Sequence, residues 1–327
     1  MPSYNIIKLY FRSPVHFGRG IGEVYDHSND MLHSDTLSGA LASAYAQLFG
    51  GKDIIEFIKR FSLSSAFPFY KNRFFFPKPM VWLNLKVNGE NELKLPKKVK
   101  KLEYIEKEIF ENILTGANIE VNPSRFIFNG KYLMSRGEDL PVFIKSEVQQ
   151  RVSRDGKGES VPYYLERIYF DKEAGLFFLI EFKDEQVVSK IKSCLNSLAD
   201  TGLGTDKSVG NGQFSYEINE INFNLPQNPN RMLLFSLYCP GENELIDILE
   251  DDCAYLLEKR GGYIAGAGPE KFRHLRKKSV FMFKEGSVFP NVEITGRIID
   301  LRPDWNDETL HHVYRDGRSF VLPLTSK

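Results

Sequence analysis

The sequence has 327 residues, of which 42% are apolar and 26% are charged, which excludes a disordered chain and allows large buried cores, most readily in two domains. Its 43 Lys and Arg residues balance its 43 Asp and Glu residues, so a nucleic-acid site has to come from local clusters of basic side chains. The three cysteines form no CxxC pair, and no stretch approaches the roughly 20 apolar residues of a membrane span. We therefore expect a cytoplasmic protein without membrane contact, disulfide or zinc site.

The N-terminal segment predicts a strand followed by a helix. Residues 5–11 (NIIKLYF) indicate the strand, and apolar residues at helical spacing over 37–48 indicate the helix. Ser34 or Asp35 is the expected N-cap, and Gly50 is the expected stop.

A more irregular region follows. A short helix is predicted over 54–61, and prolines in the phenylalanine-rich segment 62–79 indicate edge strands and packed loops. The lysine-rich residues 94–101 predict a solvated excursion that leads into a helix near 102–114. Residues 147–170 are polar and basic at their centre and strand-like at both ends, which predicts a protruding hairpin, or thumb.

The remaining elements predict a repeated plan. A strand over 176–182, a helix over 187–199 and a strand over 213–223 close the first half, and the Pro- and Asn-rich residues 225–231 mark a domain boundary. In the second half, we expect a strand over 232–239, a helix over 245–256, and strands over 279–284 and 292–299.

Both halves read as β-α-β units, which predicts an α+β fold of two ferredoxin-like (RRM-like) domains with antiparallel sheets. The first would span residues 1–225, with insertions over about 84–170 and a glycine-rich loop, and the second would span 231–327.

The glycine-rich loop follows the helix over 187–199, and residues 201–214 read TGLGTDKSVGNGQF. A phosphate-binding P-loop needs a glycine directly before Lys-Ser and a helix after the loop. Here Asp206 precedes Lys207, and the helix comes before the loop. We therefore reject nucleoside triphosphate binding.

Two interpretations of this loop remain open. Its glycines can let backbone N–H groups approach a nucleic-acid backbone, with Lys207 and Ser208 available for a phosphate oxygen. Alternatively, Gly202 caps the helix, and Gly210 and Gly212 serve a turn and a bulge.

Few residues predict catalysis or metal binding. His16 and His33 lie in the first loop, the segment that follows the predicted strand 5–11 and runs to Ser34. A histidine in such a loop can act as general base in metal-independent RNA cleavage, although a hydrogen-bonded loop histidine is the simpler interpretation. Asp35 could be a catalytic carboxylate, but helix capping explains it more simply. We expect no cofactor and no metal.

Basic clusters point instead to RNA. Residues 271–278 (KFRHLRKK) hold five Lys or Arg side chains, and the thumb holds Arg151, Arg154 and Lys157. Together with the glycine-rich loop they favour single-stranded RNA, and the absence of the aromatic RNP submotifs indicates that bases are not read on the sheet face.

At this point the sequence resembles a known family. The β-α-β domain with its glycine-rich loop is similar to the RAMP proteins of CRISPR effector complexes. Within that group, further segments resemble the fourth subunit of the type III-A (Csm) interference complex: HFG at 16–18, HSDTLSGAL at 33–41, LSSAFPF at 63–69, FFFPKP at 74–79 and HHVYRDGRSFVLPL at 311–324.

The resemblance implies a non-catalytic subunit that caps the foot of the complex, holds the 5′ handle of crRNA, contacts the large polymerase-like subunit and abuts the adjacent backbone RAMP subunit. The thumb, with Arg151 and Arg154, would intrude between crRNA and target RNA. The handle would be lined by His16 and Arg19 of the first loop and by Gly202, Gly204, Lys207, Ser208, Gly210, Asn211 and Gly212 of the glycine-rich loop.

Two alternatives stay open. A stand-alone RAMP endoribonuclease that processes CRISPR repeat RNA would share the fold and the loop, with His16 or His33 as its base. A protein-only structural adaptor would leave Lys207 and the thumb arginines without a role.

Overall fold

The computed structural model describes residues 2–18, 25–88, 95–136, 140–154, 160–249, 253–264, 272, 275–304 and 309–326, without the side chains of Leu95, Ser153 and Arg154. Of the predicted site, Arg19 and the side chain of Arg154 lie outside this part of the chain. In the part described, no helix is both long enough and apolar enough to cross a membrane.

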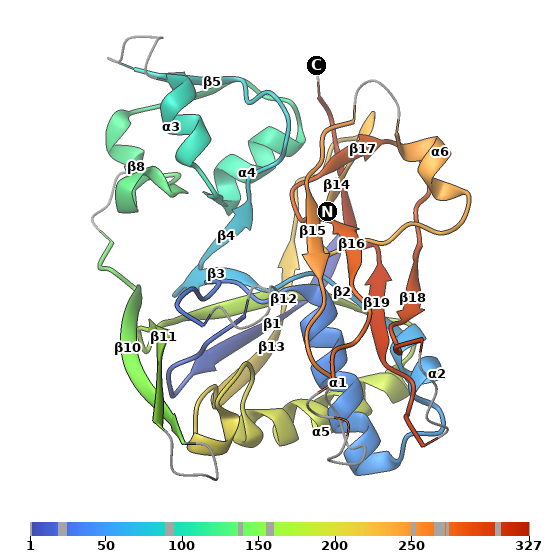
Figure 1. Ribbon diagram of the computed structural model, residues 1–327. Coiled ribbons are helices and arrows are strands. Elements are labelled where there is room, and N and C mark those ends of the chain that lie inside the picture. Colours follow the sequence, from blue (N-terminus) through green and yellow to red (C-terminus); the bar gives the residue numbers. More distant parts are fainter. Residues whose placement is uncertain are drawn as a thin grey trace.

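A central sheet organises the first half (Figure 1). Its core strands lie in the order β13 (Phe214–Asn222), β1 (Ser3–Phe11), β12 (Ala174–Phe182) and β3 (Phe67–Tyr70), with β2 (Phe61–Leu63) also paired to β12. All these pairs are antiparallel, and Ile7 lies opposite both Phe178 and Ile218. With one helix after β1 and one after β12, this is the β-α-β-β-α-β order predicted for a ferredoxin-like unit.

The helices of this unit cover one face of the sheet. They are α1 (Ser34–Phe49), the short α2 (Ile54–Lys59) and α5 (Glu185–Thr201). Helix α1 buries Leu37 and Leu41 against that face, and α5 buries Ile191 and Leu195. Helix α5 begins at a capped position, because the Asp184 carboxylate accepts a hydrogen bond from the Val187 amide at 3.0 Å. Helix α1 ends at Gly50, as predicted.

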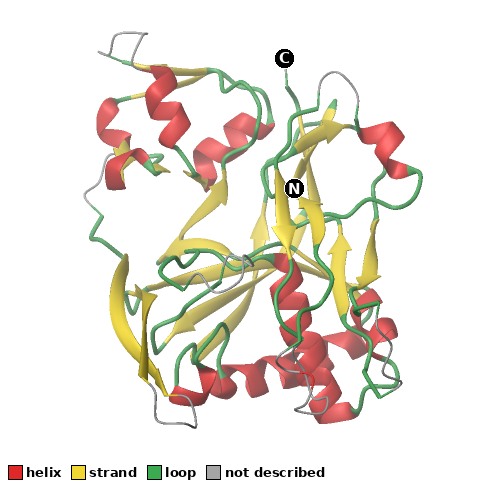
Figure 2. Ribbon diagram, in the orientation of Figure 1, coloured by secondary structure: helices red, strands yellow, loops and turns green. Residues whose placement is uncertain are grey.

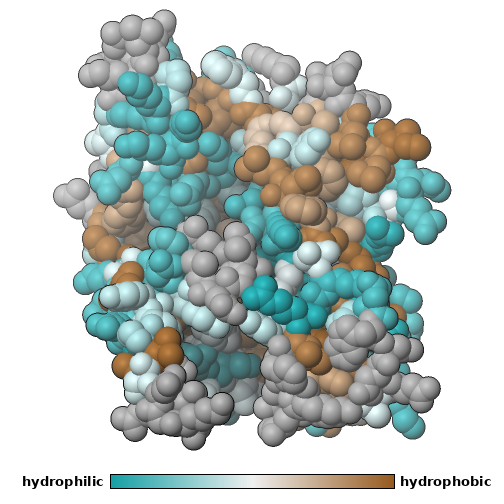
Figure 3. Space-filling model, in the orientation of Figure 1, coloured by the Kyte–Doolittle hydropathy of each residue, from teal (hydrophilic) through white to brown (hydrophobic). Residues whose placement is uncertain are grey.

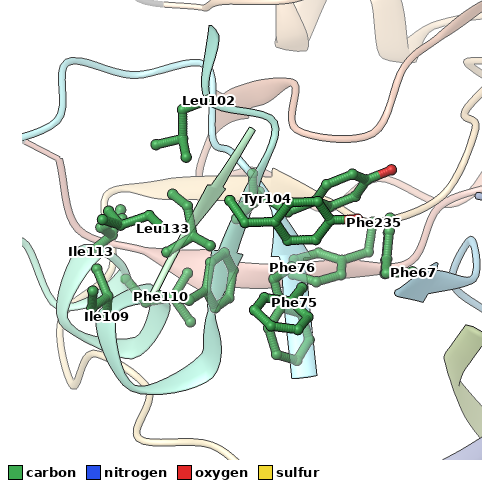
Figure 4. Packing of buried hydrophobic residues seen from close by; sticks show 14 of the residues in the cluster. Phe67, Phe75, Phe76, Leu102, Tyr104, Ile109, Phe110, Ile113, Leu133 and Phe235 are labelled. Atoms are coloured by element: carbon green, nitrogen blue, oxygen red, sulfur yellow. The ribbon is translucent and has the colours of Figure 1, made fainter. Parts of the chain in front are cut away.

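The other face of the sheet carries a phenylalanine-rich core and an inserted subdomain (Figure 4). Phe69, Phe75 and Phe76 are fully buried, so these residues belong to the core. The sheet continues through β4 (Arg73–Pro77), β6 (Tyr104–Glu106), β9 (Tyr132–Leu133) and β8 (Phe126–Ile127). The insertion adds α3 (Leu95–Lys101), α4 (Lys107–Leu114), and β5 (Leu85–Val87) paired with β7 (Ile119–Val121). The predicted solvated excursion is thus helix α3, and strand β6 interrupts the predicted helix 102–114.

The predicted thumb is a hairpin of two long strands. Strand β10 (Ile144–Arg154) pairs with β11 (Ser160–Phe170) from Ile144 opposite Phe170 to Arg154 opposite Ser160. Figure 1 shows it at the edge of the molecule, beside the sheet and away from the second half.

The second half is mainly strands and loops (Figure 2). Its sheets are antiparallel: β17 (Val288–Pro290), β14 (Arg231–Leu234) and β20 (Val321–Leu324); β15 (Leu257–Arg260) with β16 (Val280–Phe283); and β18 (Gly296–Asp300) with β19 (Tyr314–Arg318). Among its described residues, α6 (Glu244–Ile248) is the one α-helix. The described residues therefore give the predicted antiparallel α+β character but lack one of the two helices that a second ferredoxin-like unit requires.

Among the described residues, the predicted helix over 245–256 extends only to Ile248, and Leu249 and residues 253–256 are not helical. Ile248 is buried, whereas Leu245, Leu249 and Leu256 are 44%, 44% and 58% exposed. These apolar residues follow a helical spacing but have no core to cover. Figure 3 shows apolar side chains gathered over α6 and the strands beside it.

Candidate nucleic-acid interface

The glycine-rich loop docks on the first loop through its backbone. The Thr205 amide donates to the His16 carbonyl oxygen at 3.1 Å, and the Gly212 amide donates to the Pro14 carbonyl oxygen at 2.9 Å. The Gln213 amide donates to Ser13 Oγ at 2.9 Å. The structure thus brings together two loops that the sequence placed about 190 residues apart and that the handle interpretation required to be neighbours.

Three glycines allow close packing, Gly204 against the first loop and Gly202 and Gly212 within the glycine-rich loop itself. A Cβ atom added to Gly204 would lie 2.6 Å from the His16 carbonyl oxygen, and one added to Gly212 would lie 2.0 Å from the Leu203 carbonyl oxygen. Gly202 has φ 87° and donates its amide to Leu198 at the end of α5, so its predicted role as helix cap is confirmed. These glycines serve close backbone packing, which the sequence left open as an alternative to ligand contact.

The tip of the loop faces outward. It is a single 3-10 turn, Lys207–Val209, that follows Asp206 in the left-handed conformation and ends at Gly210, which forms the predicted turn with φ 85°. Lys207, Ser208 and Gly210 are exposed. Asn211 is buried at 6% exposure, so this predicted site residue lies beneath the tip.

His16 is buried beside this loop, with an exposed fraction of 2%. Its Nδ1 lies 2.7 Å from the Glu166 carbonyl oxygen, a distance that requires Nδ1 to donate. Its Nε2 atom and the Thr205 Oγ1 atom are buried and have no hydrogen-bond partner among the described residues. Buried polar atoms without partners are uncommon, and both line the cleft described next.

The cleft has a volume of about 1350 Å³ and runs between the two halves of the chain. One wall is the first loop, the glycine-rich loop and α1, and the other is formed by β15, the segment before β16 and the start of β19. The predicted residues His16, Gly204 and Lys207 line it. Figure 1 shows α1 beside the second-half strands.

Asp35 holds the two walls together, and the helix-cap prediction for this residue is wrong. The residue before the helix is His33, which forms no side-chain cap. The Asp35 carboxylate, which is fully buried, instead accepts from Arg260 Nε at 2.9 Å, from Arg260 Nη2 at 3.1 Å and from Arg315 Nη1. The other predicted N-cap, Ser34, accepts from the Leu237 amide through its Oγ at 2.9 Å.

A second buried contact also joins the two halves of the chain. Glu285 Oε1 lies 2.9 Å from His33 Nδ1 and also accepts from Ser65 Oγ. Burial alone raises the pKa of Glu285, but the charge of His33 and these hydrogen bonds outweigh it and hold the pKa below its usual value. The His33 ring is therefore fixed by a buried carboxylate.

Lys277 adds charge to the cleft wall from the segment before β16. Its burial, and then the charge of Arg260, lower the pKa of Lys277 to about 8. Two other basic residues of the predicted cluster 271–278 make separate contacts. Arg276 lies over the Tyr263 ring at 5.4 Å, and Lys278 pairs with Asp304. Lys271, Arg273 and His274 lie outside the described residues.

The structure places the thumb residue Arg151 apart from this cleft. Arg151, half-buried on β10 opposite Tyr163, is not among the residues that line the cleft. In the described residues, no group of three or more His, Cys, Asp or Glu side chains could hold a metal ion.

The sequence did not predict the roles of Arg260, Glu285 and Arg315, whereas Lys277 belongs to the basic cluster 271–278 that favoured RNA. Arg315 lies in the segment HHVYRDGRSFVLPL, on which the resemblance rests, but no spacing within that segment indicates a carboxylate partner 280 residues away. Asp35 itself is the sole local signal for this ion-pair cluster, and its position in the sequence does not indicate which residues pair with it.

Two protein-family models match the chain. The RAMP superfamily matches residues 8–215, and the "CRISPR Csm4 C-terminal domain" matches residues 227–324. The "CRISPR system Cms protein Csm4" of Methanocaldococcus jannaschii is 26% identical to this chain over an alignment of 383 positions, which covers 98% of this chain and 97% of that protein. Its counterpart in Thermococcus onnurineus is 24% identical and covers 89% and 88%.

Solved structures share the fold. The match to a crystal structure of a Csm3-Csm4 subcomplex of the type III-A CRISPR-Cas interference complex has a TM-score of 0.65 at 20% identity and covers 98% of this chain and 99% of that chain. A Csm1-Csm4 cassette in complex with cA4 gives a TM-score of 0.62 at 19% identity, with coverage of 100% and 99%. The chain therefore belongs to the RAMP superfamily and, within it, to the Csm4 proteins of CRISPR systems.

Proposed function

We propose that this chain is a non-catalytic subunit that binds the 5′ handle of crRNA in the cleft between its two halves and anchors the large polymerase-like subunit at the foot of the complex. The observation that carries the proposal is the cleft itself. It brings the glycine-rich loop, the first loop and cationic side chains of the second half around one space of about 1350 Å³.

The chemistry of the cleft suits a single RNA strand. Lys207 stands exposed at its edge for a phosphate oxygen, and Ser208 is exposed next to it in the loop. His16 Nε2 and Thr205 Oγ1 have no partner among the described residues and can bond a base or ribose inside the cleft. A handle has one sequence in every crRNA, so fixed polar atoms in a pocket can read its bases.

Relatives support the protein partners. Solved structures of similar proteins contain Csm3 in one case and Csm1 in another. On this chain, apolar side chains over α6, β15 and β16 are exposed, among them Ile246 at 81% and Phe281 at 60%. A gathered apolar surface of this kind favours contact with another protein subunit.

One observation favours the nuclease alternative. With Nδ1 donating to the Glu166 carbonyl oxygen, the neutral His16 ring presents an unprotonated Nε2 inside the cleft, which is the form a general base needs. Incubation of the purified chain with CRISPR repeat RNA tests it directly: cleavage that is lost in His16→Ala would replace the handle-binding proposal.

The handle itself is tested by co-expression with the other subunits and a CRISPR array, purification through this chain, and sequencing of the 5′ ends of the bound RNA. We expect uniform ends that begin with the repeat-derived handle, and lower RNA recovery for Lys207→Ala. Lys192→Ala is the matched control, because Lys192 is exposed on α5 and does not line the cleft.

Recovery of the large subunit without handle-bearing RNA would favour the protein-only adaptor. Equal RNA recovery for Lys207→Ala and Lys192→Ala would remove the glycine-rich loop from the proposed contact.

A further inference from the structure

The Asp35 cluster contains more positive than negative charge. One carboxylate, Asp35, accepts from two guanidinium groups, Arg260 and Arg315. Arg315 also donates to the Gly261 carbonyl oxygen at 3.2 Å. The two arginines are 4% and 7% exposed, so water does little to compensate their charge.

The other carboxylates near Arg260 have cations of their own. Glu285 and Glu258 act on Arg260 through space. Glu285 contacts His33 at 2.9 Å through Oε1, while its Oε2 has no hydrogen-bond partner among the described residues, and Glu258 lies 3.9 Å from Lys284 Nζ. Neither Glu285 nor Glu258 is among the residues that line the cleft.

One nitrogen of this cluster is unused. Arg260 donates its Nε to Asp35 and its Nη2 to both Asp35 and Thr36. Its Nη1 is buried and has no hydrogen-bond partner among the described residues. A buried guanidinium N–H without an acceptor is costly, and its usual partner is an oxygen atom carrying negative charge.

Lys277 supplies a second cation on the same wall of the cleft. The Lys277 amide donates to the Gly262 carbonyl oxygen at 3.1 Å, which fixes this residue two positions from Arg260 along the neighbouring segment. Burial lowers the pKa of Lys277, and repulsion by Arg260 lowers it further. Lys277, Arg260, Arg315 and Asp35 all line the cleft.

From these observations we infer that Arg260 Nη1 and Lys277 Nζ form a phosphate-binding subsite in the second-half wall of the cleft, facing the glycine-rich loop. A phosphodiester oxygen of a single RNA strand would accept from both. The inference rests on the proposed function for the identity of the strand, but it assigns the second half of the chain a contact with RNA that the glycine-rich loop cannot make.

Lys277→Ala tests the subsite, with Lys278→Ala as the matched control. Lys277 has a half-buried ammonium-bearing side chain whose removal relieves repulsion, so the variant is expected to fold. Lys278 has the same charge and is its neighbour, but it pairs with Asp304 and does not line the cleft.

The first measurement is the salt dependence of binding between the full chain and a fluorescent single-stranded RNA copied from the CRISPR repeat. Each phosphate contact on a single strand contributes about 0.7 to the slope of log K against log salt. We expect Lys277→Ala to lower the slope by about that amount and Lys278→Ala to leave it unchanged. Equal slopes for wild type and Lys277→Ala would overturn the subsite while the proposed function stands.

The second measurement uses inorganic phosphate against chloride at equal ionic strength, read as melting temperature. Phosphate should raise the melting temperature of the wild type and of Lys278→Ala more than that of Lys277→Ala, because a ligand of the folded state stabilises it. If phosphate has this effect but the chain does not bind RNA, the phosphate-binding subsite is retained and the proposal of handle binding is rejected. Equal shifts in all three proteins, or loss of a protein subunit rather than RNA from Lys277→Ala complexes, would overturn the subsite.

Discussion

Asp35 in the first turn of α1 and Arg260 at the end of β15 lie 225 residues apart in sequence and form a buried ion pair, with Nε 2.9 Å from Oδ2. Arg315 of β19 binds the same carboxylate oxygen. The pair joins the two halves of the chain, and both residues line the cleft between them.

Asp35→Asn is expected to destabilise the fold strongly. It leaves two buried guanidinium groups without a charged partner, and removing one member of a buried ion pair costs about 3–5 kcal/mol. The free energy of unfolding from urea titration measures this. Asp200→Asn is the control, because Asp200 is 87% exposed, lies 3.8 Å from Arg12, and should change stability by less than about 0.5 kcal/mol. Similar values for the two variants would contradict the role given to Asp35.

Gly204→Ala and Gly210→Ala separate close packing from backbone strain. Both glycines have positive φ, 93° and 85°, but a Cβ on Gly204 would lie 2.6 Å from the His16 carbonyl oxygen, whereas one on Gly210 meets nothing within 4 Å. Gly210→Ala should cost about 1–2 kcal/mol of left-handed strain. Gly204→Ala should cost more and also weaken RNA binding, because the first loop has to move. Equal melting temperatures would show that the two loops do not dock as described.

The sequence predicted most of the first half because its signals are local. Helices α1 and α5 and strands β1, β12 and β13 carry their own apolar spacing, and Gly50 and Gly202 mark two helix ends. Their spatial order then follows from the β-α-β-β-α-β pattern. The glycine-rich loop was also recognised from a local pattern, although Gly202, Gly204 and Gly212 pack closely against backbone atoms of the chain itself.

The second half was predicted less well because its apolar residues do not all face a core. The spacing of Leu245, Leu249 and Leu256 is typical of a helix, yet these side chains are exposed and the helix ends at Ile248. The sequence singled out the basic cluster that contains Lys277, but it could not predict the buried ion pairs of the cleft wall, since Asp35 finds its partners 225 and 280 residues away. Local pattern carries no information about such pairs.

Glu244 should contribute to acid denaturation. Burial raises its pKa, but hydrogen bonds from the Gly241 and Thr295 amides and from Tyr238 outweigh burial and lower the pKa of Glu244 to about 2. Since the pKa is depressed in the folded state, this stabilisation is present above the usual value of 4.5 and is lost as the pH falls from there towards 2.

Glu244→Gln should therefore lower the free energy of unfolding at neutral pH by about 2 kcal/mol, the value of hydrogen bonds to a charged group. Its difference from wild type should shrink as the pH falls from 4.5 to 2. Denaturant titrations across this range test the prediction, with the exposed neighbour Glu242→Gln as control. A difference that is constant with pH would show that ionisation of Glu244 is not the cause.

The outward face of the thumb should matter for target RNA and not for folding. Val148, Val152 and Tyr164 lie on one face of the β10–β11 hairpin, and each is more than half exposed, whereas Leu165 on the opposite face is buried. Apolar side chains held out on a rigid hairpin are suited to pack against stacked bases. Tyr164→Ser should therefore leave the melting temperature of the chain unchanged, because no buried contact is lost.

In the assembled complex, Tyr164→Ser should weaken capture of complementary target RNA severalfold while crRNA recovery stays at the wild-type level, a loss consistent with about 1–3 kcal/mol for a stacking contact. Filter binding of labelled target RNA measures it. Val142→Ser is the control, since Val142 is 54% exposed and precedes the hairpin. If both variants bind target RNA as the wild type does, the hairpin does not meet the target strand; if Tyr164→Ser instead loses crRNA, the thumb belongs to the handle site.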